Sequence, residues 1–157
     1  MILELKGVHG YYDKSHILNG VDLAVAQGTS VCLLGRNGVG KSTTMKTIMG
    51  MLNPKEHCKT EGSIKFEGKE LVGMASHSIA RLGIAYVPQG RHIFPTLSTE
   101  ENLRVAARTG VDGSSKWNLE SVYQFFPRLQ ERKDSKGDKL SGGEKQKMAI
   151  ARAIYKD

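Results

Sequence analysis

The sequence predicts an α/β domain in which strands dominate the first part and helices the second. Residues 2–8 and 17–25 have the apolar pattern and turn boundaries of strands. The run Thr29–Leu34 has the uninterrupted apolar character of a buried strand, and a glycine-rich loop after it leads into a helix. Strands and helices that alternate along one chain are typical of α/β folds.

Length and composition indicate one globular domain. The chain has 157 residues, of which 39% are apolar and 25% charged. Its 23 Lys and Arg exceed its 16 Asp and Glu by 7, which indicates an anionic partner such as phosphate, nucleic acid or an acidic membrane surface. No secretory signal or membrane-spanning stretch is present. Cys32 and Cys58 are too few for a disulfide framework, so a reduced cytosolic chain is expected, with Cys32 as a small core residue.

The remaining elements follow from spacing and capping. Helical spacing after the glycine loop predicts a helix with Met45, Ile48, Met49 and Leu52 on one face. Beyond it the pattern predicts a strand, a short helix and a strand, at residues 62–66, 76–81 and 83–87.

The second half is predicted to be helical. Two Ser-x-x-Glu capping boxes predict helix starts at Ser98 and Ser141, the first helix extending to about Arg108. Between these helices we expect a loop at 109–116 and a helix from Trp117 to about Lys133 that Pro127 interrupts. The helix after Ser141 has an apolar face, formed by Met148, Ala151, Ile154 and Tyr155.

The glycine loop fits the phosphate-binding pattern Gly-x4-Gly-Lys-Ser/Thr. It consists of Gly35, Arg36, Asn37, Gly38, Val39, Gly40, Lys41, Ser42 and Thr43. Glycine lets phosphate oxygens approach the backbone, whose N–H groups form an anion-binding nest at the positive end of the next helix. Lys41 would place its ammonium by the β- and γ-phosphates, and the Ser42 hydroxyl would ligate Mg²⁺. The loop therefore predicts a nucleotide site rather than a chance glycine turn.

A second glycine-rich helix start narrows the class. Leu140-Ser141-Gly142-Gly143-Glu144 resembles the signature motif of the ATP-binding cassette (ABC) family, usually Leu-Ser-Gly-Gly-Gln. The resemblance implies that Ser141, Gly142, Gly143 and Glu144 close on ATP held by the phosphate loop of a second subunit in a head-to-tail dimer. Alone, the same residues would be as consistent with an ordinary capped helix.

Two further segments resemble the same family. Tyr86-Val87-Pro88-Gln89 is similar to its Q-loop, which implies that Gln89 contacts Mg²⁺ and the attacking water. Lys41 and Gln89 are then the expected catalytic residues, and Ser42 and Gln89 the expected Mg²⁺ ligands. An aromatic residue before the phosphate loop matches the family's adenine-stacking position; counting back from Val21 favours Tyr12 over Tyr11.

The resemblance implies the P-loop NTPase fold of an ABC nucleotide-binding domain. Such a domain has a RecA-like core, an N-terminal antiparallel β part and a helical subdomain. The expected division is a core with the phosphate loop at about 1–90, a helical subdomain at about 91–145 and the signature helix at 146–157.

The family's later motifs are not found. In the family, a strand after the signature helix ends in a Mg²⁺-binding Asp and a catalytic Glu, and a switch His follows. Asp157 has no apolar strand before it, and all five histidines precede the signature. We therefore expect a single incomplete domain with its C-terminal portion missing, the N-terminal part of a longer ATPase. ATP hydrolysis by these 157 residues alone is expected to be deficient.

The amino-acid sequence around Gln89 indicates the subfamily. Residues 83–95 and 97–103 resemble the ATPase subunit of branched-chain amino acid importers, and urea and short-chain amide importers are similar. This implies a homo- or heterodimer with a second nucleotide-binding subunit. It also implies membrane permease subunits and, indirectly, a periplasmic or surface solute-binding protein. The chain would be soluble when isolated and peripheral on the cytoplasmic face of the inner or plasma membrane.

Two other functions stay open. A non-transport ABC ATPase acting on nucleic acid or ribosomes would suit the charge of +7, but no arm, coiled-coil insertion or zinc site interrupts the chain, so nucleic acid is not the expected partner. A non-enzymatic fragment that folds poorly, or dimerises through exposed sheet, is the third hypothesis.

Overall fold

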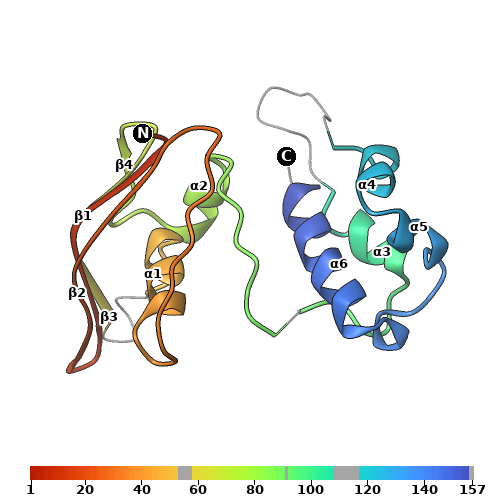
Figure 1. Cartoon of the computed structure of the whole chain (residues 1–157), viewed down its shortest axis with the longest axis horizontal. Coiled ribbons are helices and arrows are strands. Elements are labelled where there is room, and N and C mark those ends of the chain that lie inside the picture. Colours follow the sequence, from red (N-terminus) through yellow and green to blue (C-terminus); the bar gives the residue numbers. More distant parts are fainter. Residues whose placement is uncertain (53–57, 91, 108–116, 156–157) are drawn as a thin grey trace. The chain divides into compact units, whose positions relative to one another are not determined.

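The computed structural model describes residues 1–52, 58–90, 92–107 and 117–155. The chain divides into two compact units, Met1–Ile84 and Ala85–Asp157. The first contains the described strands and two helices, and the second is helical (Figure 1). The loop predicted at 109–116 lies outside the described residues, as do Arg108 and Asp157.

The first unit is built on a four-stranded antiparallel sheet with the order β2-β1-β3-β4. Its strands are β1 (Leu3–Tyr12), β2 (Ser15–Val25), β3 (Cys58–Phe66) and β4 (Lys69–Glu70). β1 and β2 form a hairpin whose turn has Asp13 at a φ of 51°, and the other edge of β1 pairs with β3. The strands predicted at 2–8, 17–25 and 62–66 are thus confirmed, and each is longer than its apolar pattern.

The core of the first unit lies between this sheet and two helices, α1 (Lys41–Ile48) and α2 (Ser76–Ala80). Helix α1 contacts both β1 and β2. The buried apolar side chains come from strands, helices and the segments after them: Leu5, Val8, Leu18, Ile48, Met49, Leu52, Cys58, Ile64, Leu71 and Ile79. Burying a Leu or Ile side chain contributes about 1.5–3 kcal/mol, so this cluster holds α1 against the hairpin.

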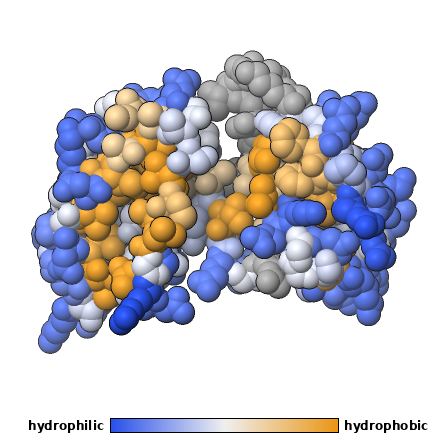
Figure 2. Space-filling view, viewed as in Figure 1, coloured by the Kyte–Doolittle hydropathy of each residue, from blue (hydrophilic) through white to orange (hydrophobic). Residues whose placement is uncertain are grey.

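Two predicted strands are wrong. Residues 29–34 and 83–87 form no ladder with any described strand. Leu34 is 87% exposed, Val31 48%, and Cys32 is exposed rather than a core residue. Apolar content predicts burial but supplies no neighbour, and a buried strand needs hydrogen-bond partners on its edges. Figure 2 shows hydrophobic residues at the visible surface of this unit.

The second unit consists of short helices packed around one cluster. Its helices are α3 (Thr99–Arg104), α4 (Leu119–Phe125), α5 (Pro127–Glu131) and α6 (Gly142–Ile154), with a 3₁₀ turn at Gly137–Lys139. The cluster joins all four helices through Leu103, Val122, Tyr123, Leu129, Leu140, Met148 and Ala151. The predicted apolar face of the last helix is therefore confirmed at Met148 and Ala151, with Tyr155 packed beside them.

Local sequence explains the helix boundaries of this unit. Both predicted capping boxes are formed, at Ser98 and at Ser141. Pro127 occupies the first turn of α5, where its missing N–H has no helical role, so it divides α4 from α5 as predicted. Asn102 is fully buried and accepts from the Phe94 N–H, while its amide donates to three carbonyls of residues 94–98. This side chain fixes the segment that follows Gln89 against α3.

Candidate functional site

The phosphate loop occupies the turn before α1 in the first unit. Residues 35–39 are exposed, and α1 begins at Lys41 with Gly40 as its N-cap. Gly40 has a φ of 96°, and a Cβ there would lie 2.8 Å from Cδ2 of Leu18. Gly38 has a φ of 86° with nothing within 4 Å of a Cβ. Gly40 is thus required by the fold, whereas at Gly38 the backbone conformation alone favours glycine.

The Lys41 side chain folds back onto the phosphate loop. Its Nζ donates to the carbonyl oxygens of Gly35 and Arg36, at 2.7 Å each. The first turn of α1 contains no acidic residue, and Gly40 supplies no side-chain cap. The first N–H groups of α1 therefore point outward beside one ammonium, an arrangement suited to an anion.

The other loop residues have distinct surroundings. Thr44 is buried, and its hydroxyl donates to the Gly40 carbonyl at 3.0 Å. Ser42 is exposed and Thr43 half-buried. A serine hydroxyl on an exposed residue such as Ser42 is the kind of oxygen ligand that Mg²⁺ prefers.

Tyr12 lies on the same side of the sheet as the phosphate loop. It pairs with the buried Cys58 across β1 and β3, two residues after Gly10, whose Cβ would touch Leu18. Since side chains alternate along a strand, Tyr12 shares the face of Gly10 and Tyr11 the opposite face.

Tyr11 is occupied by neighbours on that opposite face. Its ring stacks on His16 with centroids 4.3 Å apart, and its hydroxyl donates to Glu61 at 3.3 Å. Burial and the Glu61 carboxylate raise the pKa of Tyr11. Tyr11 is therefore engaged by its neighbours, whereas Tyr12 lies on the other face of the sheet.

The signature residues form the start of α6 in the second unit. The Ser141 hydroxyl accepts from the Glu144 N–H at 3.3 Å, and Glu144 Oε2 accepts from the Ser141 N–H at 2.7 Å. A Cβ at Gly143 would have nothing within 4 Å, so the packing of this chain does not demand glycine there. Backbone N–H groups of the first helical turn have no partner within a helix, so those of Gly142 and Gly143 are available to a ligand.

Arg132 is a neighbour of the signature that the sequence did not predict. Its Nε lies 3.9 Å from Glu144 Oε1. Hydrogen bonds from Ser141, then the charges of Arg132 and Arg128, lower the pKa of Glu144, so this carboxyl is ionised at neutral pH. No helical or strand period relates positions 132 and 144, so sequence alone offered nothing to pair them.

Gln89 is an exposed turn residue of the second unit. Shortly after it, the chain is attached to α6 by Arg152, whose Nη1 donates to the His92 carbonyl at 2.9 Å and whose Cζ lies 4.8 Å from the Phe94 ring centroid. Burial lowers the pKa of Arg152. Gln89 and the signature thus belong to one compact unit, and the phosphate loop to the other.

The structure brings together no cluster of three His, Cys, Asp or Glu side chains suited to a metal within the described ranges. Among those residues, no helix has the length and apolar character needed to cross a membrane. A pocket of about 890 Å³ in the first unit is lined by residues such as Thr47, Leu71 and Ser76, away from the phosphate loop.

Comparison with known proteins identifies the family. The model of the ABC transporter family matches residues 18–157, so the chain belongs to this family. Solved structures agree: an ATP-binding subunit of an ABC transporter is 32% identical with a TM-score of 0.78, and covers 99% of this chain. A nucleotide-free ATP-binding cassette from an ABC transporter is 26% identical, also with a TM-score of 0.78 and 99% coverage. These likenesses confirm the predicted ABC fold.

Curated relatives include transport ATP-binding proteins. The high-affinity branched-chain amino acid transport ATP-binding protein BraG of Pseudomonas aeruginosa is 40% identical over 153 residues, which is 98% of this chain and 64% of BraG. The probable branched-chain amino acid transport ATP-binding protein LivF of Archaeoglobus fulgidus is 34% identical over 92% of this chain and 59% of its own length. A Nod factor export ATP-binding protein I of Burkholderia orbicola is 31% identical, and the chain covers 49% of it.

The chain spans about three-fifths of the length of the importer relatives it matches, 64% and 59%. The two solved structures are covered over 62% and 65% of their chains. The family and fold are therefore shown for the matched region.

Proposed function

We propose that the chain is the ATP-binding part of an ABC importer subunit that couples ATP binding and hydrolysis to solute uptake. One observation carries the proposal: the chain has two glycine-rich helix starts, an open cationic one at Gly40-Lys41 and a capped one at Ser141. A single ATP has little use for two such helix starts of one chain. Two copies arranged head to tail would use both.

The residues of the first unit are proposed to hold the nucleotide. The N–H groups of the loop and of the first turn of α1 would bind the β- and γ-phosphates, and Lys41 would exchange its two carbonyl partners for phosphate oxygens. Tyr12 would stack on the adenine. Mg²⁺ would neutralise developing phosphate charge, with the Ser42 hydroxyl and Gln89 as its protein ligands.

The proposed partners are a second nucleotide-binding subunit and membrane permease subunits on the cytoplasmic face. The expected solutes are branched-chain or related amino acids, because BraG and LivF are named for this transport. Uptake of labelled leucine by cells with and without the gene tests this proposal. Uptake of labelled urea or acetamide, with unchanged leucine uptake, would instead support the alternative substrate class.

A complementation experiment tests the head-to-tail site. Lys41→Ala removes the proposed phosphate ligand, and Ser141→Arg blocks the signature. Neither variant alone should therefore dimerise when ATP is added. A mixture of the two contains one intact loop facing one intact signature, and should associate in ATP to about half the extent of the unmodified chain, as measured by light scattering. Failure of the mixture, while the unmodified chain associates, would contradict the arrangement.

Hydrolysis by the 157 residues alone is proposed to be negligible, because the family's Mg²⁺-binding Asp and catalytic Glu are not among them. A turnover assay with purified chain, with the Lys41→Ala variant as background, measures this. A rate above that background and similar to those of intact family members would refute the proposal.

A further inference from the structure

We propose that Arg132 is a positioning residue for the signature that acts through Glu144: the capping box turns the Glu144 carboxylate toward the N-cap, and Arg132 beside it offsets its negative charge, so that the start of α6 can receive the phosphates of ATP. This inference rests on the proposed function, because the phosphates would come from ATP held by a partner's loop. Arg132 lies outside every motif of the sequence.

The need for such a residue arises from the chemistry of the signature. Glu144 stands in the first turn of α6, where an anion would approach the Ser141 hydroxyl and the backbone N–H groups of Gly142 and Gly143. An ionised carboxylate there repels phosphate oxygens. The usual residue of the resembled motif, glutamine, has the same shape without the charge.

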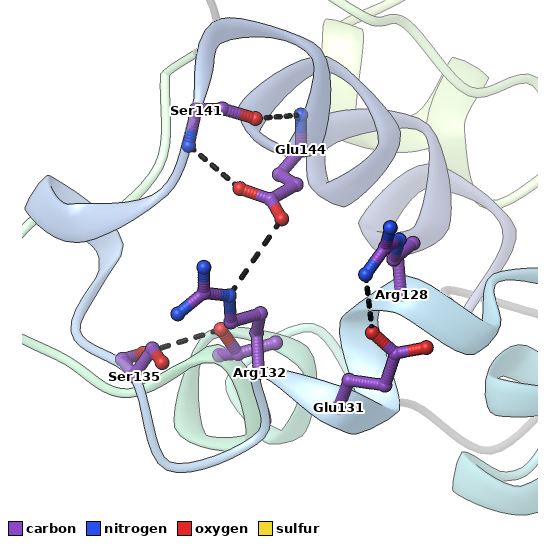
Figure 3. A network of polar contacts seen from close by, with 7 residues as sticks. Arg128, Glu131, Arg132, Ser135, Ser141 and Glu144 are labelled. Atoms are coloured by element: carbon purple, nitrogen blue, oxygen red, sulfur yellow. Dashed lines mark hydrogen bonds and ion pairs between the residues drawn. The ribbon is translucent and has the colours of Figure 1, made fainter.

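The geometry shows how the carboxylate is held. Glu144 Oε2 accepts from the Ser141 N–H at 2.7 Å, and Oε1 faces Arg132 Nε at 3.9 Å. Figure 3 shows the Glu144 side chain directed toward these two residues, so that both oxygens are engaged within the chain. The side chain of Glu144 is only 17% exposed, while that of Arg132 is 57% exposed.

Helix α3 provides an internal control for the role of Arg132. It has the same capping box: Ser98 N–H donates to Glu101 Oε2 at 2.7 Å, and Glu101 N–H to Ser98 Oγ at 3.1 Å. Within the described residues, Glu101 has no ion pair, yet its box is formed. A capping box therefore needs no arginine, and the first turn of α3 lacks the glycines of the signature.

Arg132 is better placed for this role than its neighbour Arg128. Arg128 Nη1 pairs with Glu131 at 2.7 Å on the same helix, whereas the ion pair of Arg132 is with Glu144 (Figure 3). The Arg132 carbonyl accepts from the Ser135 N–H at 2.9 Å, which anchors its backbone. Exposed ion pairs contribute little to stability, so the value of this pair lies in the local charge.

The test compares ATP-dependent association of four variants by light scattering at low salt. Arg132→Gln leaves a net negative pair and should raise the ATP concentration for half-association by about tenfold, the effect of roughly one uncompensated charge. Arg132→Lys retains the charge and should stay within about twofold. In the double variant Arg132→Gln/Glu144→Gln this pair of positions is again neutral, so most of the lost ATP-dependent association should be restored. Arg128→Gln, the matched control, should change association by about twofold or less.

The dependence on salt concentration distinguishes an electrostatic effect of Arg132→Gln from a structural one. The difference between Arg132→Gln and the unmodified chain should shrink as ionic strength rises, because the Debye length falls to about 8 Å at 0.15 M. A loss that persists in the double variant, or that salt does not reduce, would show a structural role and overturn the inference. So would an Arg132→Gln variant that associates like the unmodified chain.

Calorimetric titration of each variant with ATP distinguishes a failure of the proposed head-to-tail function from a failure of the proposed role of Arg132. All Arg132 variants should bind ATP at their own phosphate loop like the unmodified chain. Absence of ATP binding in the folded unmodified chain, or binding without association, would refute the proposed head-to-tail function, and this inference with it. Normal binding and association, with no effect of Arg132→Gln, would refute this inference alone.

Discussion

The starts of α1 and α6 are both rich in glycine, but they satisfy their backbone in opposite ways. At α1 the N-cap is Gly40 in a left-handed conformation, no side chain caps the helix, and no acidic residue lies in the first turn. At α6 the N-cap is Ser141, a capping box is complete, and Glu144 is ionised and paired with Arg132. One helix start is open and positive; the other is closed and nearly neutral.

This difference indicates how two anion sites can divide one ligand. An uncapped N-terminus gives up about 1 kcal/mol of helix stability in exchange for free N–H donors and attracts phosphate strongly. A capped and neutral N-terminus keeps its stability and retains only the donors that face outward. This contrast fits the proposed roles, in which the start of α1 would hold ATP without a partner and the start of α6 would add contacts only once ATP is already held.

The largest effect on ATP affinity is expected at the open helix start. Lys41→Ala removes the ammonium proposed to bind the phosphates and should weaken ATP binding at least a hundredfold, about 2.7 kcal/mol, measured by calorimetric titration. Lys46→Ala, on an exposed site of the same helix, is the matched control and should bind like the unmodified chain. Equal losses in both variants would show a nonspecific charge effect.

Gly40→Ala tests whether the loop conformation is built into the fold. The positive φ costs about 1–2 kcal/mol for alanine, and the Cβ would also collide with Leu18, adding about 1–3 kcal/mol. Chemical unfolding of the first unit measures the sum. Gly38→Ala has the strain without the collision, so it should lose less stability. Equal losses would remove Leu18 from the explanation.

Tyr12→Ala should weaken ATP binding by about five- to tenfold, because an aromatic ring on a base contributes about 1 kcal/mol or more. Tyr11→Ala is the control, since Tyr11 stacks on His16 on the opposite face. It should leave ATP affinity unchanged. A larger loss at Tyr11 than at Tyr12 would reverse the assignment.

The smallest expected effect is the pH-dependent contribution of Glu144, at the start of α6, to the free energy of unfolding. The pKa of Glu144 is lower in the folded chain than its ordinary value, mainly through hydrogen bonds from Ser141. Its ionised form thus stabilises the fold above the unfolded pKa, and this contribution disappears as pH falls through the folded pKa. The stability advantage over Glu144→Gln should decline on acidification from about pH 6 to pH 3. An advantage that does not change with pH would contradict this role.

Local chemistry was readable from the sequence. The capping boxes at Ser98 and Ser141, the division of helices at Pro127 and the hairpin strands all follow from a few neighbouring residues, and all are present. The phosphate loop was predicted in the same way, as a glycine pattern directly before a helix. The roles of its residues remain proposals.

Relations across the chain were not readable. The apolar run 29–34 was predicted to be a buried strand, but burial depends on a neighbouring strand, which no local pattern supplies. The contact of Arg132 with Glu144 joins the end of α5 to the start of α6, and the buried Asn102 holds the segment at 94–98. Both contacts depend on how the helices pack. From the sequence alone, Arg132 and Asn102 therefore could not be told apart from ordinary surface residues.

The most direct test of the central claim is the free energy of unfolding of the chain with and without Mg·ATP. A folded chain whose open helix start binds ATP should gain about 2.7 kcal/mol at 100 times its dissociation constant. The Lys41→Ala variant, which should bind ATP at least a hundredfold more weakly, should gain about 0.4 kcal/mol or less at the same ATP concentration. A chain that is folded by circular dichroism yet shows no shift at millimolar ATP, or a shift that is undiminished in Lys41→Ala, would contradict the claim.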